Sequence, residues 1–401
     1  MADTVVLFGA FDRHNFGDLL FPHIAEALLG RDTRLLHAGL VTNDLRAVGG
    51  HAVQALSVLA AQGALDGATL IHVGGETLAC DAWLAALMLL RRDELEATIG
   101  WLGGRTRERN AWVRERLGTA ALAPYVVGRE RAPGLHRILH AGVGGCALAA
   151  AAPALRDEVL ASLRSADALG VRDALTLAQL ASAGLPAQLL PDPAVLVAEL
   201  FGTRIAAAAA QGEVAQLHKR FARGYLAVQF SAEFGDDATL DVLAAQLDEM
   251  AAHSGLGLVL FRAGAAPFHD DLTVLERAAA RLRAPWAVFE SLQLWDICAL
   301  VARASGFAGS SLHGRIVAMA VGRPRISLRS PRLPLDAVGK QAAFAAAWEL
   351  PGLPGEVAVD ALAAGWRDAW AAEPAALQAL AKDLAARYRH GFAALCRRAG
   401  V

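Results

Sequence analysis

The chain is predicted to be an α/β protein with two Rossmann-like, doubly wound lobes, and three observations lead to this prediction. It has 401 residues, more than a single hydrophobic core normally serves. Short apolar runs alternate with longer helical patterns through most of the sequence. The alternation also stops once, at an alanine-rich segment, and then restarts. Strands that alternate with helices form parallel sheets with helices on both faces.

Composition excludes several classes of protein. The formal net charge is −2, so overall charge gives no reason to expect a nucleic-acid partner. No run of about 18 residues is apolar and free of charge, Gly and Pro, and the segment before Val5 lacks a basic signal-peptide region. We therefore expect a soluble, cytoplasmic protein. The four cysteines are scattered and show no metal-ligand or disulfide spacing, so no metal site is predicted and metal dependence stays open.

The first lobe is predicted over residues 1–200. Two of its helices have clear ends, Gly17–Leu29 before Gly30 and Asp173–Ala183 before Gly184. Residues 91–137 interrupt the alternation as an arginine-rich insertion that is expected to be mostly helical. The strands expected in this lobe are Thr4–Gly9, Thr33–Ala38, Thr69–Val73, Arg137–Ala141, Ala168–Val171 and Gln188–Leu190.

A helical connector is predicted over residues 201–223, because this alanine-rich segment has no strand pattern. The second lobe follows over residues 224–350, and residues 351–401 are predicted to form a C-terminal helical tail. The strands expected in the second lobe are Gly224–Phe230, Leu256–Phe261, Ala287–Glu290, Gly306–Ala308 and Arg325–Leu328. Its expected helices are Ala238–Ala252, Asp271–Leu282, Leu292–Ala304 and Leu312–Val321.

In open α/β sheets a ligand binds beyond the carboxyl ends of the strands, so polar residues at those ends are candidates for a site. Asn15, Gly17 and Asp18 follow the first strand. The alternative for Asp18 is that it only caps the next helix. The segment is not a Gly-x-Gly-x-x-Gly fingerprint, so a dinucleotide is not implied.

Two further strands of the first lobe end in candidate residues. Gly74 and Gly75 would allow close backbone approach to a ligand, and Glu76 follows them. Arg172 is suited to a bidentate contact with a carboxylate or phosphate. The alternative for Arg172 is a pair with Asp173 that caps the following helix.

The segment Ala308–Pro324 contains the strongest candidates in the second lobe. A strand ends in a turn of small residues, Ser310 and Ser311, and a helix then begins with His313 in its first turn. Backbone N–H groups at such a turn can bind an anion, and His313, Gly314 and Arg315 would lie beside it. The alternative for His313 is a buried histidine with a satisfied hydrogen bond. Earlier in the second lobe, Asp270 or Asp271 is expected to cap a helix rather than to bind a metal.

Together these residues resemble the polysaccharide pyruvyl transferase family, over a span from about Val5 to Lys340. The late block resembles the Ser-Ser-Leu-His-Gly branch of exopolysaccharide ketal pyruvyltransferases, in which Ser311 stands where many family members have arginine. This difference leaves open which arginine holds the donor. The motifs that carry the resemblance are the Asn15-Phe-Gly-Asp18 block, Gly74-Gly75, Val171-Arg-Asp173 with Asp192-Pro193, and Ser310-Ser-Leu-His-Gly314 with Gly322 and Pro324.

The resemblance implies a fold similar to GT-B glycosyltransferases and transfer of a pyruvyl unit from phosphoenolpyruvate to two hydroxyls of a sugar, glycan or lipid-linked saccharide. Phosphoenolpyruvate is then the donor substrate and no cofactor is expected. His313 is the candidate general acid, and Asp18 or Glu76 the candidate base. Arg172, Arg315 and the Ser310–Ser311 turn would bind the donor.

Two other functions stay open at this point. One is a GT-B-like glycosyltransferase that uses a nucleotide sugar, and the other is a non-enzymatic binding member of the fold. A peripheral membrane contact also stays open, because the arginines of residues 91–137 suit an anionic acceptor or membrane surface as well as they suit a solvated helical face.

Overall fold

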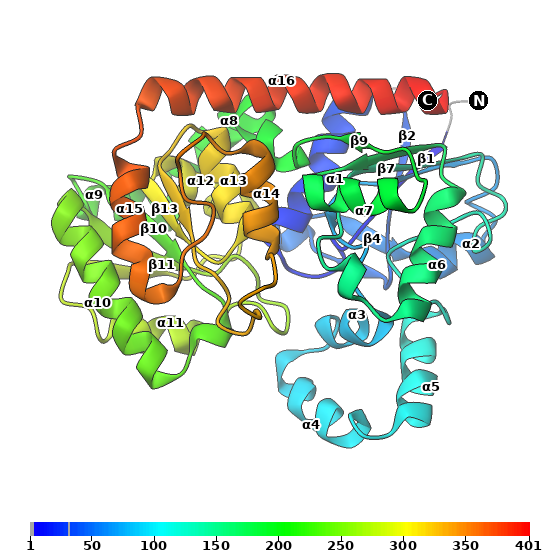
Figure 1. The fold of residues 1–401 in the computed structure, drawn as a ribbon, viewed down its shortest axis with the longest axis horizontal. Helices are drawn as coiled ribbons and strands as arrows, with labels where there is room; N and C mark the ends of the chain where they lie inside the picture. Colours follow the sequence, from blue (N-terminus) through cyan, green and yellow to red (C-terminus); the bar gives the residue numbers. More distant parts are fainter. Residues whose placement is uncertain (1–3, 31–32) are drawn as a thin grey trace. The chain divides into compact units, whose positions relative to one another are not determined.

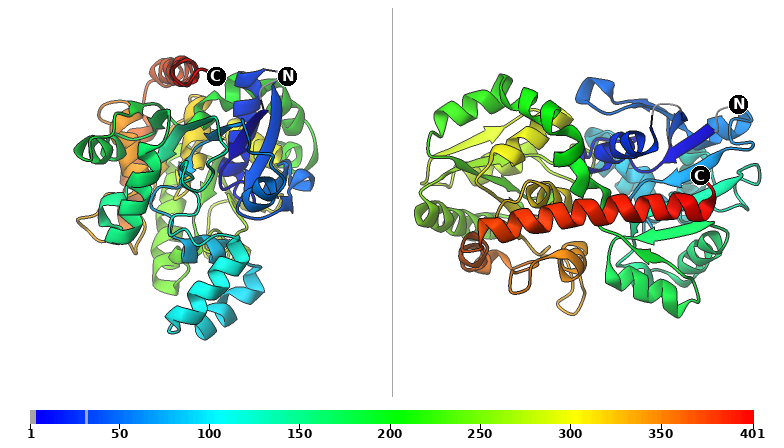
Figure 2. Two further views of the ribbon diagram at one scale, coloured as in Figure 1. Left: turned by 90° about the vertical axis from the view of Figure 1, so that its right-hand side faces the viewer. Right: turned by 90° about the horizontal axis from the view of Figure 1, so that it is seen from above.

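The computed structural model describes residues 4–30 and 33–401 and divides into two compact units. Unit 1 comprises Met1–Pro193 and Arg387–Val401, and unit 2 comprises Ala194–Ala386. Each unit contains its own sheet with helices on both faces (Figures 1 and 2). The expectation of an α/β protein with two doubly wound lobes is confirmed.

The sheet of unit 1 is parallel except at one edge, where β3 and β4 are antiparallel. Its strand order is β3-β4-β2-β1-β5-β7-β8-β9, and β6 pairs with β7. The strands are β1 (Thr4–Phe8), β2 (Arg34–Gly39), β3 (Asn43–Asp44), β4 (Ala52–Ala55), β5 (Thr69–His72), β6 (Gly75–Glu76), β7 (Arg137–Gly144), β8 (Ala168–Val171) and β9 (Gln188–Leu189). The helices are α1 (Phe16–Leu29), α2 (Leu56–Ala61), α3 (Ala82–Met88), α4 (Arg92–Leu102), α5 (Thr106–Leu117), α6 (Pro153–Arg164) and α7 (Ala174–Ser182).

The sheet of unit 2 is wholly parallel, with the strand order β12-β11-β10-β13-β14. Its strands are β10 (Tyr225–Gln229), β11 (Gly257–Phe261), β12 (Trp286–Phe289), β13 (Gly306–Gly309) and β14 (Arg325–Ser327). The helices are α8 (Val197–Ala209), α9 (Gly212–Arg220), α10 (Asp237–Ser254), α11 (Leu272–Ala279), α12 (Leu294–Arg303), α13 (Leu312–Ala320), α14 (Lys340–Trp348) and α15 (Leu362–Trp370). The last helix, α16 (Pro374–Ala399), continues into unit 1.

Each sheet has one point at which the strand order reverses. In unit 1 the chain runs from β1 outward to β2 and later returns to place β5 on the other side of β1. In unit 2 it runs from β10 outward to β11 and later places β13 on the other side of β10. Ligand sites of open α/β sheets lie at such reversal points, outside the carboxyl ends of the strands. The candidate residues should therefore be sought after β1 and β5, and after β10 and β13.

The segment predicted as a connector is helical but forms part of unit 2. It contains α8 and α9, and α8 packs against α12. The Phe201 and Trp295 rings lie 5.1 Å apart between centroids, and the Arg204 guanidinium lies 4.2 Å from the centre of the Trp295 ring. Because these contacts bury an apolar face of α8 against unit 2, the boundary between the units falls at Pro193 instead of near residue 200.

The predicted tail also differs from what is observed. The unit boundary lies within α16, and residues from Arg387 onward are assigned to unit 1. Arg137 Nε donates to the carbonyl oxygen of Ala399 at 2.6 Å, which ties the end of the helix to the start of β7. The last helix therefore belongs partly to unit 2 and partly to unit 1 and is not a separate C-terminal element.

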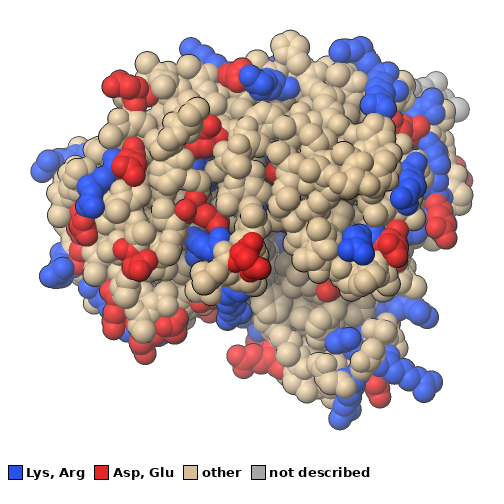
Figure 3. All heavy atoms as spheres, in the orientation of Figure 1, with Lys and Arg blue, Asp and Glu red and all other residues tan. Residues whose placement is uncertain are grey.

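The arginine-rich insertion is helical only in its first part, in α4 and α5, and residues 118–136 contain no helix or strand. Basic and acidic side chains are interspersed over these two helices on the face drawn in Figure 3. Among residues 4–30 and 33–401, no single helix meets the length and hydropathy expected of a membrane span. A pair bent by 73°, Pro193–Ala209 with Gly212–Arg220, meets them only when the two helices are taken together.

Candidate functional site

The segment after β1 begins helix α1 with a side-chain cap. Asn15 Oδ1 accepts a hydrogen bond from the Gly17 N–H at 3.2 Å, so Asn15 is the capping residue. The alternative interpretation of Asp18 as the cap is therefore wrong. Asp18 instead lies in the first turn of α1, is 5% exposed, and has its Oδ2 atom 3.8 Å from a terminal nitrogen of Arg13.

Arg13 connects Asp18 to a buried polar cluster that the sequence did not reveal. Its Nη1 donates to the Tyr125 hydroxyl at 2.7 Å, and that hydroxyl lies 3.3 Å from Oδ1 of Asp12. Asp12 Oδ2 accepts from the backbone N–H of Leu40 at 2.6 Å. Burial raises the pKa of Asp12, and Arg13 opposes this shift.

The charge of Arg13 is supported by its neighbours. Burial by itself would lower the pKa of this guanidinium, but Tyr125, Asp18 and Asp12 raise it above its ordinary value. Its Nε atom is buried and has no hydrogen-bond partner within the described part of the chain. A permanent cation thus lies beside Asp18 with one donor unused. Only the position of Asp12 and Arg13 after the first strand could have pointed to them in the sequence.

The turn after β5 lies next to the first turn of α1. Gly74 and Gly75 have φ values of +116° and +91°, a backbone conformation that favours glycine. A side chain on Gly74 would also lie against the Phe21 ring, and the Cβ position of Gly75 is 3.7 Å from Asp18 Oδ1. The structure therefore brings the predicted residues Asn15, Gly17, Asp18 and Gly75 together at the point where the strand order of unit 1 reverses.

Arg172 forms a buried ion-pair network instead of a pair with its neighbour. Its Nη1 donates to Oδ2 of Asp192 and its Nη2 to Oε2 of Glu76, both at 2.8 Å. Glu76 Oε1 also accepts from the backbone N–H of Cys146 at 2.9 Å. A Cβ on Gly144 would lie 2.3 Å from Glu76 and 2.7 Å from Arg172, so a side chain there would have to displace this ion pair. Glu76 and Arg172, which the sequence placed on separate strands, are direct partners.

Asp173 is the cap of α7, as the alternative interpretation expected. Its Oδ1 accepts from the Thr176 N–H at 2.7 Å, and the Thr176 hydroxyl lies 2.9 Å from its Oδ2. The same hydroxyl accepts from the Gly145 N–H at 3.0 Å. This arrangement fixes the turn after β7 to the start of α7, next to Arg172.

In unit 2, Ser311 caps α13 and the preceding turn is held by Gln229. Ser311 Oγ accepts from the Gly314 N–H at 3.1 Å. The N–H groups of Ser310 and Ser311 donate to the backbone and side-chain oxygens of Gln229 at 3.1 and 2.7 Å. These two amides, expected to point outward, are thus used within the protein. The Gly314 amide in the first turn of α13 is likewise used, by the Ser311 cap.

Gln229 continues the network to Asp270, which the sequence predicted only as a possible helix cap. Asp271 is the cap, since its Oδ1 accepts from the Thr273 N–H at 2.9 Å. Asp270 is instead 2% exposed and accepts from Gln229 Nε2 at 2.7 Å and from the Ala263 N–H. Burial raises the pKa of Asp270 to about 7. The signal in the sequence that could have revealed this network is Gln229, a polar residue at the end of an apolar strand.

His313 and Gly314 lie in the first turn of α13. His313 is 8% exposed and immediately follows Leu312, the first helical residue. A Cβ on Gly314 would lie 2.4 Å from the Phe307 ring. The absence of a side chain at Gly314 therefore lets α13 pack closely on β13, which fixes the position of the neighbouring imidazole.

Arg315 uses its terminal nitrogens for contacts within unit 2. Its Nη2 donates to Oε2 of Glu349 at 2.6 Å, and its Nη1 donates to the Gly355 carbonyl at 2.8 Å. Arg325 donates to both oxygens of the same carboxylate. Burial lowers the pKa of Arg315 to about 10, with Glu349 opposing the shift. The geometry indicates that Arg315 holds α13 to β14 and to the segment after α14.

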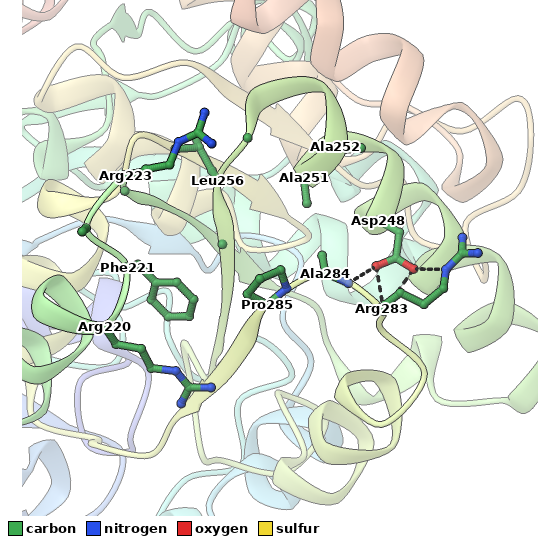
Figure 4. Close-up of a pocket in the computed structure, with 14 residues that line it drawn as sticks. Arg220, Phe221, Arg223, Asp248, Ala251, Ala252, Leu256, Arg283, Ala284 and Pro285 are labelled. Carbon is green, nitrogen blue, oxygen red and sulfur yellow. Dashed lines mark hydrogen bonds and ion pairs between the residues drawn. The ribbon is translucent and has the colours of Figure 1, made fainter.

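A cavity of about 600 Å³ lies at the other end of the unit 2 sheet (Figure 4). Gly224 comes just before β10, Gly257 begins β11 and Pro285 comes just before β12, so the cavity is at the amino ends of these strands. Its walls combine apolar side chains such as Phe221 with an ion pair between Arg283 and Asp248 at 3.0 Å. None of the predicted site residues lines it.

The fold defines an α/β protein of the GT-B type. Two solved structures of UDP-GlcNAc 2-epimerase from Methanocaldococcus jannaschii are similar to it in fold. One has a TM-score of 0.52 at 9% sequence identity, covering 96% of this chain and 99% of the other. The second, in complex with UDP-GlcNAc and UDP, has a TM-score of 0.50 at 11% identity, covering 93% and 94%. No curated protein matches the sequence.

The family model described as polysaccharide pyruvyl transferase matches residues 136–330. This match confirms the resemblance that the sequence motifs indicated. It includes Arg172 and the segment from Ser310 to Arg315, whereas the blocks around Asp18 and Glu76 lie before it. The matched family is one of transferases that act in polysaccharide synthesis.

Proposed function

We propose that the protein transfers the pyruvyl unit of phosphoenolpyruvate to two hydroxyls of a sugar, glycan or lipid-linked saccharide and forms a pyruvate ketal. The observation that carries this proposal is the family match over residues 136–330, because it spans the two segments that contain Arg172 and His313. The polar clusters at the reversal points of both sheets support it, since ligands of such folds bind there.

The proposed reaction has two stages. Protonation of the CH₂ carbon of phosphoenolpyruvate converts it to a methyl group and leaves an oxocarbenium centre at the phosphate-bearing carbon. One acceptor hydroxyl bonds to that carbon and loses its proton. The C–O bond to phosphate then breaks, phosphate leaves with the electron pair, and the second hydroxyl bonds to the same carbon. Of the two hydroxyl protons, one balances the proton given to the methyl group and the other leaves on phosphate.

We assign His313 as the general acid that protonates the CH₂ carbon. Its place in the first turn of α13 puts it beside N–H groups that favour an anionic substrate. Asp18 and Glu76 are the candidate bases for the hydroxyl protons. Asp18 has Arg13 beside it, and Glu76 is fixed by Arg172 and by a backbone N–H.

The contacts of the arginines bear on which of them is suited to bind the donor. The terminal nitrogens of Arg172 and Arg315 donate to carboxylates of the protein, so these two arginines are better suited to position other groups than to bind a substrate directly. Arg13 has an unused donor and lies beside Asp18. We therefore add Arg13 to the proposed phosphate- or carboxylate-binding residues, while Arg172 and Arg315 stay predictions.

Acceptor contacts and any membrane contact also stay predictions. The α4–α5 hairpin exposes 56% of Trp101, an aromatic ring of the kind that stacks on sugar faces or lies at a membrane interface. Trp295 and Trp348 are buried, and Trp286 is 36% exposed. Trp101 is thus the better candidate for an acceptor contact.

The test is calorimetric titration of the purified protein with phosphoenolpyruvate, with UDP and GDP in parallel. Saturable phosphoenolpyruvate binding that is weakened in Arg13→Gln and retained in Arg46→Gln is the expected result, because Arg46 is an exposed residue that pairs with Asp44. Phosphate release in the presence of saccharide acceptors then measures turnover. Binding of a nucleotide without binding of phosphoenolpyruvate would overturn the proposal in favour of a nucleotide-sugar enzyme.

A further inference from the structure

Four ionisable side chains form a cluster beside the second half of α1, away from the cap at Asn15. His23 and Glu26 are three residues apart and so share one face of the helix. His37 lies on β2, and His51 comes just before β4. The ligand atoms of His23, Glu26 and His51 all lie within 4.8 Å of one another. This cluster belongs entirely to unit 1 and contains none of the residues assigned above to the transferase reaction.

One carboxylate oxygen lies between two imidazoles. Glu26 Oε1 is 2.8 Å from Nε2 of His37 and 3.3 Å from Nε2 of His51. The His37 nitrogen is poorly aligned for a hydrogen bond despite this distance. The His37 and His51 rings are stacked with centroids 4.2 Å apart, and the His23 and His51 centroids are 4.1 Å apart. Three imidazoles thus surround one carboxylate.

Two ring nitrogens of the cluster have informative surroundings. His23 Nε2 lies 2.8 Å from the Gly49 carbonyl oxygen. A metal-ligating histidine commonly gives its other N–H to a backbone carbonyl in this way. The Nδ1 atom of His51 is buried and has no hydrogen-bond partner within residues 4–30 and 33–401. Hydrogen bonding within the protein therefore leaves part of this cluster unsatisfied.

The cluster also has the charge that a divalent cation requires. Zinc is bound by ionised carboxylates and neutral imidazoles. A carboxylate with neutral imidazoles carries one negative charge and is complementary to a divalent ion.

We propose that His23, Glu26 and His51 bind a zinc-class divalent ion, with His37 or water in the fourth position. Imidazole and carboxylate are zinc ligands, whereas magnesium prefers oxygen ligands alone. Ligand atoms on one tetrahedral zinc lie about 3.3 Å apart, given Zn–N and Zn–O distances of about 2.0–2.2 Å. Side-chain rotations that move the ligand atoms by about one ångström would bring them from their present separations, all within 4.8 Å, to this distance.

Such an ion would join three segments of unit 1. His23 and Glu26 are on α1, His51 precedes β4, and Gly49 ends the short 3₁₀ turn Arg46–Val48. The same helix begins with Asn15 and has Asp18 in its first turn. The ion would therefore fix the helix whose other end contains the candidate base. The inference does not depend on the proposed transferase activity.

The test uses zinc alone, with protein freed of metal by chelation. Titration in competition with a chromophoric chelator is expected to give one Zn²⁺ per chain, and Co²⁺ is expected to give the visible absorption of a four-coordinate site. Glu26→Gln and His51→Asn should each weaken zinc binding at least about 10- to 100-fold. His253→Asn, which changes an exposed histidine at the end of α10, should leave it unchanged. Mg²⁺ should not compete.

Circular dichroism of each variant separates loss of the site from loss of folding. If His51→Asn does not fold, Glu26→Gln and the cobalt spectrum of the wild type still decide the question. Absence of zinc binding by the wild type, or equal affinity in Glu26→Gln, His51→Asn and His253→Asn, would overturn the proposal. Neither result depends on phosphoenolpyruvate, so failure here leaves the transferase proposal unaffected.

Discussion

Arg172 donates to Oε2 of Glu76 across 2.8 Å, and the two partners differ in exposure: 2% of the Arg172 side chain is accessible, compared with 24% of Glu76. Asp192, the second partner of Arg172, is wholly buried. The arginine therefore lies behind Glu76 and fixes its carboxylate, while Glu76 is the member of the network that solvent or a substrate can reach. This relationship makes Arg172 a positioning residue in the present structure.

Replacement of Arg172 should be strongly destabilising. Arg172→Ala breaks the buried ion pair with Asp192, and breaking a buried pair typically costs about 3–5 kcal/mol. Arg46→Ala, which removes an exposed pair with Asp44, should change stability little, because solvent screens this pair. Denaturant unfolding followed by circular dichroism measures both. Similar stability losses in the two variants would show that the Arg172 network is not structural.

Asp270 should make stability depend on pH in an unusual direction. Its folded-state pKa of about 7 lies above the ordinary 3.8, so the native state binds this proton more tightly than the unfolded chain does. The stability that this raised pKa contributes is fully present below about pH 4 and is lost as pH rises toward 7. A shift of this size corresponds to at most roughly 4 kcal/mol.

The comparison of wild type with Asp270→Asn isolates this effect, because the amide mimics the protonated acid. The wild type should lose stability relative to the variant as pH rises from about 4 to 7. Asp236→Asn provides the opposite case. The Thr239 N–H lowers the pKa of Asp236, so the stability that this carboxylate contributes is lost as pH falls. Parallel pH profiles for wild type and Asp270→Asn would contradict the assignment.

Gly314→Ala should disturb the packing of α13. The new Cβ would lie 2.4 Å from the Phe307 ring, and overpacking of a core typically costs about 1–3 kcal/mol. Gly100→Ala is the matched control, since no heavy atom lies within 4 Å of its Cβ position and alanine is favoured over glycine in a helix by about 0.5–1 kcal/mol. Thermal unfolding should show opposite shifts in Tm for the two variants. A stabilised Gly314→Ala protein would contradict the close packing.

His313→Asn should reduce turnover without a matching loss of stability. Removal of a general acid typically lowers the rate by about 10²- to 10⁴-fold. Phosphate release from phosphoenolpyruvate with a saccharide acceptor measures the rate, and His253→Asn, at an exposed position, serves as the control. If His313→Asn retains near-wild-type turnover, the imidazole is not the acid.

Much of the fold followed from the sequence, because parallel strands are short apolar runs with helices between them. Ala168–Val171 was predicted with its observed ends, and the other long strands were displaced by a few residues at most. The short strands β3 and β4 at the edge of the sheet were missed. Asn43–Asp44 and Ala52–Ala55 are too short, and the first is too polar, for a periodic signal. The position of α8 was also missed, since its packing against α12 is a tertiary property.

The candidate site was predictable only as a set of strand ends. Asp18 and His313 could be singled out, but their partners could not. The pairing of Glu76 with Arg172 joins residues 96 positions apart, and Tyr125 contacts Asp12 across 113 positions. Such contacts depend on strand order, which alternation does not specify. The same limit hid the histidines around Glu26, because they come from separate elements.

The last helix has a consequence for how the chain acquires its structure during synthesis. Unit 1 includes residues 387–401, and Arg137 at the start of β7 donates to the carbonyl of Ala399. A chain that emerges from the ribosome in order therefore has all the strands of unit 1 long before the segment that completes it. The surface of unit 1 that α16 covers therefore stays exposed until nearly the whole chain has been translated. We expect C-terminal truncation at residue 386 to lower soluble yield.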